Sequence, residues 1–126
     1  MRIITGKYGG RRLVSFKANH IRPTTDRVKE AIFSKIQFDV EGAKVLDLFS
    51  GTGNLAFEAL SRGAESVYAV ELHPQSIRIL KENKKMLGVQ EELQVEKNDV
   101  LRYLKRENEP FDIIFIDHPF TKKDGS

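Results

Sequence analysis

Short apolar runs alternate with segments of helical periodicity from residue 43 onward. Strands are predicted at residues 44–49, 66–71, 93–96 and 111–117, and helices at 55–62, 74–87 and 100–106. Gly63 and Gly88 fall where the first two of these helices are expected to end. Apolar strands that alternate with helices are typical of a parallel sheet covered on both faces. The pattern therefore predicts an α/β fold.

The first twenty-two residues have a different pattern. Two strand-like runs, residues 2–5 and 12–16, flank a turn with three glycines at residues 6–10, which predicts a β-hairpin. A lone hairpin is only marginally stable, so we expect it to pack against another element. We therefore divide the chain into a hairpin extension, residues 1–22, and a domain at residues 23–126.

A helix is predicted directly after Pro23. Thr24 or Thr25 can cap it, and it is expected to run to about Gln37. Helical spacing puts five side chains on one face, all apolar except Lys35: Val28, Ala31, Ile32, Lys35 and Ile36.

Charge is distributed unevenly along the 126 residues. Residues 1–30 hold eight Lys and Arg and two acidic residues, a net charge of +6, whereas the rest of the chain sums to −3. A basic end on a mildly acidic body suggests that a polyanion is held there, although a solvated basic surface is an equally good interpretation of composition alone. The chain has no cysteine, which excludes disulfides and thiolate chemistry and suits a reducing, cytoplasmic setting. No apolar run approaches the ~20 residues of a membrane span.

A glycine-rich loop follows the first predicted strand of the α/β region. The sequence from Asp47 to Gly53 reads DLFSGTG, and Gly51, Gly53 and Ala56 have the spacing of the dinucleotide fingerprint. Ligands of such sheets bind at the carboxyl ends of the strands. A nucleotide-like ligand is therefore expected here, with an ordinary βα turn as the alternative.

Each of the four predicted strands delivers a carboxylate to the same edge of the sheet. These residues are Asp47, Glu71, Asp99 and Asp117. Glu71 can accept hydrogen bonds from ribose hydroxyls, and Asp99 can accept one from an adenine amino group. For any one of these carboxylates taken alone, a helix cap is the better interpretation. Four carboxylates together indicate a binding site.

Asp47 discriminates between two cofactors. A carboxylate beside the glycine loop suits a ligand that carries an ammonium group and repels a pyrophosphate. S-adenosyl-L-methionine has an ammonium group and no phosphate, whereas NAD has a pyrophosphate and no ammonium group. The sequence therefore favours the methyl donor over NAD.

Several segments of the chain resemble a known protein family. Residues 47–53 resemble motif I of the Rossmann-like S-adenosylmethionine methyltransferases, and Asp117 to Phe120 resemble their Asp-Pro-Pro-Tyr/Phe motif for methylating exocyclic amines. More narrowly, residues 1–13, 22–33 and 58–64 are similar to the bacterial 16S ribosomal RNA (guanine-N2)-methyltransferases. The resemblance runs from Met1 through Phe120 and implies a parallel sheet of order 3-2-1-4.

The resemblance also implies roles by position. The donor would be bound by Asp47, Phe49, Gly51, Gly53, Glu71, Leu72, Asp99 and Val100, and the target guanine by the catalytic residues Asp117, His118, Pro119 and Phe120. Ribosomal RNA, free or in a small subunit, would be held by Arg2, Lys7, Arg11, Arg12, Arg22 and Arg27. No metal ion is implied.

Two departures from the family pattern bear on activity. His118 replaces the first proline of the motif, which removes the ring that fixes φ. The family's domain also continues beyond this motif, so the fourth strand is expected to form a sheet edge. These departures make a catalytically impaired RNA-binding fragment an alternative. A DNA or adenine methyltransferase is a further alternative, because the four-residue motif does not specify the base.

Overall fold

A computed structural model describes residues 1–15 and 25–117. Its elements, in chain order, are α1 (Asp26–Lys35), β1 (Lys44–Leu48), α2 (Asn54–Ser61), β2 (Ser66–Glu71), α3 (Pro74–Leu87), β3 (Leu93–Lys97), α4 (Val100–Lys105) and β4 (Ile113–Ile116). Within the described ranges the strands form one parallel sheet of order β3-β2-β1-β4. The predicted fold class and strand order are confirmed. The largest difference in bounds is at β4, which is three residues shorter than predicted.

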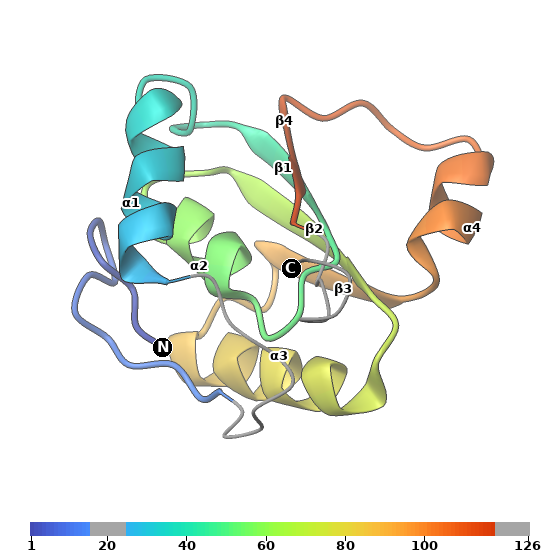
Figure 1. Ribbon diagram of the computed structural model, residues 1–126, viewed down its shortest axis with the longest axis horizontal. Coiled ribbons are helices and arrows are strands. Elements are labelled where there is room, and N and C mark those ends of the chain that lie inside the picture. Colours follow the sequence, from blue (N-terminus) through green and yellow to red (C-terminus); the bar gives the residue numbers. More distant parts are fainter. Residues whose placement is uncertain (16–24, 118–126) are drawn as a thin grey trace, which may run out of the picture.

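The helices lie unequally on the two faces of the sheet (Figure 1). The main core contains side chains from α1, α2 and α3, among them Phe33, Phe57 and Leu80, packed against one sheet face. A smaller cluster on the other face brings Val100 and Tyr103 of α4 against Leu46, Leu48 and Val70. None of the described helices is long and apolar enough to cross a membrane.

The predicted apolar face of α1 is only partly the buried one, because Ile32 and Ile36 pack against the core while the other two apolar positions do not. Val28 is 49% exposed and Ala31 is also exposed, whereas Lys29 and Phe33 are fully buried. Phe33 makes an edge contact with Phe115 of β4, with ring centroids 5.5 Å apart. The prediction counted apolar positions only, but α1 is oriented so that a charged side chain enters the interior together with Phe33. The helix does begin as expected, with Thr25 accepting a hydrogen bond from the Val28 N–H.

The N-terminal segment, residues 1–15, forms a short hairpin that we call the N-terminal arm. Its pairing is a single antiparallel bridge between Arg2 and Arg12. The arm lies along α2, where the Ser61 hydroxyl donates to the Thr5 carbonyl at 2.6 Å. Gly6 approaches α2 so closely that a Cβ would come within 2.0 Å of the Ser61 carbonyl oxygen. The arm is therefore packed against the domain, as the marginal stability of a lone hairpin requires, and its predicted boundary at residue 22 lies outside the described residues.

Helix α4 is attached to the sheet by a cluster of aromatic and charged side chains. Tyr68 of β2 stacks on Tyr103, with centroids 5.9 Å apart, and donates a hydrogen bond to Glu96. Arg106 binds both carboxylate oxygens of Glu96, at 2.6 and 2.9 Å. This arrangement fixes the end of β3, where the predicted adenine-binding residues begin.

Strand β4 lies at the end of the described sheet, paired with β1. On the α4 side its Ile114 and Ile116 are 52% and 69% exposed. The predicted sheet edge is therefore present within the described residues.

Candidate functional site

The loop after β1 contains three residues with positive φ. Phe49 has φ 59°, Gly51 has φ 62° and Gly53 has φ 95°. The left-handed conformation costs a non-glycine residue roughly 1–2 kcal/mol, and such strain gathers at binding sites. The loop is closed by the Ser50 N–H donating to the Val70 carbonyl at 3.1 Å and the Gly53 N–H donating to the Ser50 carbonyl at 3.0 Å.

The two loop glycines are required for different reasons. A Cβ on Gly53 would lie 2.4 Å from the Phe57 ring and 2.6 Å from Leu80. Among the described residues, a Cβ on Gly51 would meet no atom within 4 Å apart from those of its chain neighbours. Gly53 therefore permits α2 to pack closely behind the loop, whereas at Gly51 the backbone faces open space that a ligand can approach.

Asp47 lies at the base of this loop. It is 1% exposed, and its Oδ2 accepts a hydrogen bond from the Ser50 hydroxyl at 2.8 Å. The pKa of Asp47 is raised to about 7, chiefly by burial; the negative charges of Asp117 and Glu71 also raise it, and the hydrogen bonds from Ser50 and the Ala56 backbone lower it. The site therefore already contains a carboxylate that a cation would stabilise in its ionised form.

Glu71, at the end of β2, is bonded directly to the glycine loop. One carboxylate oxygen accepts the Gly51 N–H at 2.7 Å, and the other accepts the His73 N–H at 3.0 Å. The side chain is 5% exposed. The structure thus brings together Asp47, Gly51 and Glu71, three of the residues predicted to bind the donor. The neighbouring Leu72 is 48% exposed.

The other predicted site residues lie further along the same edge. Asp99 is the N-cap of α4 and accepts a hydrogen bond from the Arg102 N–H at 3.1 Å. It is therefore a helix cap, as the alternative interpretation of a single carboxylate expects. The next residue, Val100, is buried. Asp117 is exposed at the end of β4. The remaining three members of the predicted catalytic motif, His118, Pro119 and Phe120, lie outside the described residues.

The predicted RNA-binding cations that the structure describes are exposed. Arg2, Lys7, Arg11 and Arg12 belong to the N-terminal arm and Arg27 to α1. Arg2 forms an ion pair with Asp26 at 3.1 Å, and the Arg11 guanidinium donates to the Met86 carbonyl at 3.3 Å. Arg22 lies outside the described residues.

Sequence reasoning missed a buried polar network beside the loop. Lys29 of α1 and Glu58 of α2 are fully buried, with 3.3 Å between the ammonium nitrogen and a carboxylate oxygen, and Asn83 of α3 is also fully buried. Arg62 donates to Glu58 at 2.8 Å. One signal was available, because Glu58 interrupts an otherwise apolar helical run, and a charge there needs a partner.

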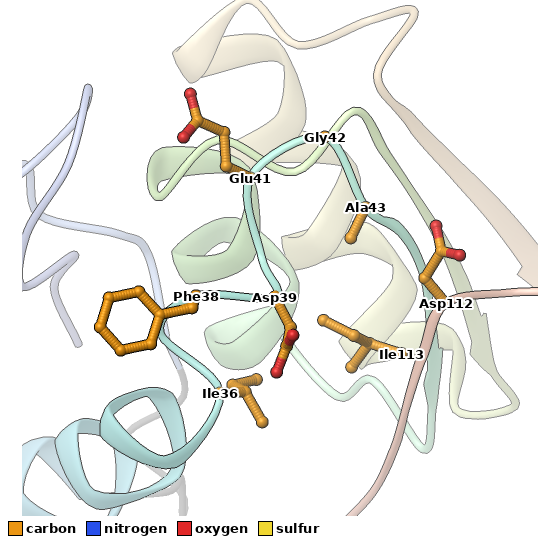
Figure 2. Close-up of a pocket in the computed structure, with 8 residues that line it drawn as sticks. All are labelled: Ile36, Phe38, Asp39, Glu41, Gly42, Ala43, Asp112 and Ile113. Carbon is orange, nitrogen blue, oxygen red and sulfur yellow. The ribbon is translucent and has the colours of Figure 1, made fainter.

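A surface pocket lies at the end of the sheet opposite the glycine loop (Figure 2). It is lined by Ile36, Phe38, Asp39, Glu41, Gly42, Ala43, Asp112 and Ile113. These residues precede or begin β1 and β4, so the pocket is at the amino ends of the strands, away from the glycine loop. Its three carboxylates make it a poor site for an anionic ligand.

Comparisons with known proteins identify the relatives of this chain. The family model described as "Conserved hypothetical protein 95" matches residues 1–125. A protein of Bacillus subtilis named "Putative rRNA methyltransferase YlbH" is 42% identical over 98% of this chain and 68% of its own length. "Ribosomal RNA small subunit methyltransferase D" of Haemophilus influenzae is 40% identical over 95% of this chain and 64% of its own length.

A solved structure supports the same relationship. The structure titled "Putative methyltransferase yhhF from Escherichia coli" matches with a TM-score of 0.87 at 32% identity, covering 95% of this chain and 64% of the solved one. The chain thus spans about two thirds of the length of these relatives. It belongs to the family described as Conserved hypothetical protein 95.

Proposed function

We propose that this protein transfers a methyl group from S-adenosyl-L-methionine to ribosomal RNA, at the exocyclic N2 amine of a guanine. The observation that carries the proposal is the buried Asp47 carboxylate at the base of a glycine loop that Glu71 holds from the next strand. The names of the relatives support a ribosomal RNA substrate. The guanine N2 position comes from the resemblance of residues 117–120 to the family motif.

The residues around the loop fit the methyl donor. The ionised Asp47 carboxylate attracts the ammonium group of the donor's methionine part, and Gly51 leaves open space beside it. Each Glu71 oxygen accepts one backbone N–H and has a further acceptor position for a ribose hydroxyl. Leu72, Asp99 and Val100 would border the adenine. When bound, S-adenosyl-L-methionine supplies a methyl group activated by its sulfonium.

This chain then has to present a weak nucleophile to that methyl group. The amino lone pair of guanine is delocalised into the ring. In the proposed reaction the Asp117 carboxylate and the backbone carbonyl of His118 each accept a hydrogen bond from one of the two amino N–H groups. These bonds turn the nitrogen lone pair toward the methyl group and stabilise the positive charge that develops on nitrogen. Phe120 stacks on the base once it has left its helix or loop. As the N–CH3 bond forms, the S–CH3 bond breaks and S-adenosylhomocysteine leaves. No strong general base is required, because the methylated nitrogen is then cationic and its acidic proton passes to water.

The exposed cations of the N-terminal arm would bind the RNA backbone. Phosphate contacts of this kind position a nucleic acid without reading its sequence. Arg2 and Arg12 are both exposed and are paired across the arm, so they can contact the same stretch of RNA backbone.

Calorimetric titration with S-adenosyl-L-methionine and with NAD tests the donor site. We expect binding of the methyl donor and none of NAD, and Glu71→Ala should weaken donor binding. Binding of NAD alone would contradict the proposal. Incubation with a radiolabelled donor and 16S ribosomal RNA or immature small subunits then tests transfer, and mapping the methylated nucleotide distinguishes guanine N2 from adenine.

An RNA-binding protein without transferase activity is the second candidate. It is favoured by His118, which stands where the family motif has its first proline. Transfer by this chain excludes it. If transfer appears only in His118→Pro, the defect lies in the motif. If neither chain transfers methyl but both bind RNA, the second candidate is correct.

A further inference from the structure

Two fully buried polar side chains connect the N-terminal arm to the glycine loop. They come from different helices, Lys29 from α1 and Asn83 from α3. We define the donor loop as residues 49–54, from the residue after β1 through Asn54, the first residue of α2.

Lys29 contacts both segments with one ammonium group. Its nitrogen donates to the Arg2 carbonyl of the arm at 2.6 Å and to the Asn54 side-chain oxygen of the donor loop at 2.7 Å. Burial lowers the pKa of Lys29, and the carboxylate of Glu58 opposes that shift. Glu58 in turn accepts the N–H groups of Ile4 and Thr5, at 2.9 and 3.2 Å. The Lys29–Glu58 pair therefore binds three consecutive peptide units of the arm.

Asn83 makes the second connection. Its side-chain oxygen accepts the Val14 N–H at 2.8 Å, and its amide nitrogen donates to the Val14 carbonyl at 3.0 Å. The same nitrogen lies 3.3 Å from the Thr52 carbonyl of the donor loop. Thr52 also reaches the arm directly, because its hydroxyl lies 3.3 Å from the Met1 sulfur.

These contacts make a displacement of the arm costly to the loop. Thr52 and Asn54 flank Gly53, so the connections hold the loop on both sides of a residue that tolerates no Cβ. Because the linking groups are buried, moving the arm would leave polar atoms unpaired away from water, which costs more than an exposed bond. The arm and the donor loop are thus held in one arrangement.

We propose that Lys29 and Asn83 are positioning residues that couple RNA binding on the N-terminal arm to donor binding at the loop. The inference rests on the proposed function, and it adds that each ligand increases the affinity for the other. Such coupling is reciprocal, because RNA must strengthen donor binding by the same factor as the donor strengthens RNA binding.

The test measures the affinity for S-adenosylhomocysteine, the demethylated donor, with and without 16S ribosomal RNA. For the wild-type chain we expect RNA to tighten binding by about 5-fold or more. In Asn83→Ala and in Lys29→Met the ratio of the two affinities should fall close to one. Asn108→Ala is the matched control, because Asn108 also donates to backbone carbonyls, those of Tyr103 and Arg106, but lies beside α4. It should retain the wild-type ratio.

The outcomes separate this inference from the proposed function. If the wild-type chain binds no S-adenosylhomocysteine, the proposed function fails and takes the coupling with it. If it binds but RNA leaves the affinity unchanged, or if both variants keep the wild-type ratio, the coupling alone is refuted. If both variants unfold, hydrogen exchange of the wild-type chain decides: RNA should slow exchange of the Thr52 and Gly53 amides, and unchanged rates would overturn the inference.

Discussion

Asp47 combines two properties that conflict in a folded protein. It is buried, which disfavours its charge, and it is placed where the proposed ligand needs that charge. Its raised pKa means that the folded state binds a proton more tightly than the unfolded state, so its contribution to stability is full below pH 4 and is lost as the pH rises through about 7. The buried Asp47 carboxylate therefore destabilises the fold at neutral pH relative to acidic pH.

Asp47→Asn should consequently stabilise the protein more at pH 8 than at pH 5, by roughly 3 kcal/mol, because about two units of the pKa shift lie above pH 5. The same substitution should weaken binding of S-adenosyl-L-methionine, because the ammonium loses its partner. Urea denaturation at the two pH values and calorimetry measure the two effects.

Asp39→Asn is the control for this substitution, because Asp39 is an exposed carboxylate in the pocket at the end of the sheet opposite the glycine loop. It should change neither the pH dependence of stability nor donor binding. Equal stabilisation by Asp47→Asn at both pH values would contradict the electrostatic account.

The two loop glycines give a second prediction at the residue scale. Gly53→Ala should destabilise the fold by about 2 kcal/mol or more, because the new Cβ overlaps Phe57 and Leu80 in addition to the strain at positive φ. Gly51→Ala adds a Cβ to open space and should cost only the strain, roughly 1 kcal/mol. Thermal unfolding of the two variants checks the order, and equal losses would refute the packing argument.

At the scale of elements, the Lys29–Glu58 pair joins α1, α2 and the N-terminal arm. Glu58→Ala would leave the buried ammonium of Lys29 without its counter-charge and would remove the acceptor of the Ile4 and Thr5 N–H groups. Breaking a buried pair by removing one partner typically costs about 3–5 kcal/mol. We expect a loss of that size in urea denaturation.

The exposed pair between Arg2 and Asp26 provides the comparison. Both of these side chains are substantially exposed, at 62% and 44%, so solvent screens the pair. Asp26→Asn should therefore cost about 1 kcal/mol or less. A loss for Glu58→Ala no larger than this would mean that the buried network contributes little to the attachment of the arm.

At the scale of the whole molecule, the basic arm stands against a mildly acidic body. If the arm binds phosphates, Arg11→Ala and Arg12→Ala should each weaken RNA binding and reduce the slope of log affinity against log salt concentration by about 1. Lys105→Ala removes an exposed cation from α4, on the other face of the sheet, and should leave the slope unchanged. Filter binding over a range of salt concentrations makes the comparison. Unchanged slopes for the arginine variants would identify them as solvated charges only.

The sequence by itself determined the order of the elements and the parallel sheet, and the resemblance to a known family added the strand order. β2 and α3 fall on their predicted residues because apolar periodicity, Pro74 and Gly88 are local signals. It also placed Asp47, Gly51 and Glu71 at one edge, since parallel strands bring their carboxyl ends together. These features depend on the local pattern of apolar residues and on the common direction of parallel strands. Both can be read from a single sequence.

Only the tertiary structure decided which polar side chains enter the interior. Lys29 displaces Val28 from the buried face of α1 because its partners, Glu58 and the Arg2 carbonyl, come from segments distant in the chain. Asn83 is buried for the same reason, since its partners are in the arm and the donor loop. The cost of burying a polar group depends on what surrounds it in space, and no local pattern contains that information. The attachment of the N-terminal arm to the donor loop is therefore a property of the folded chain alone.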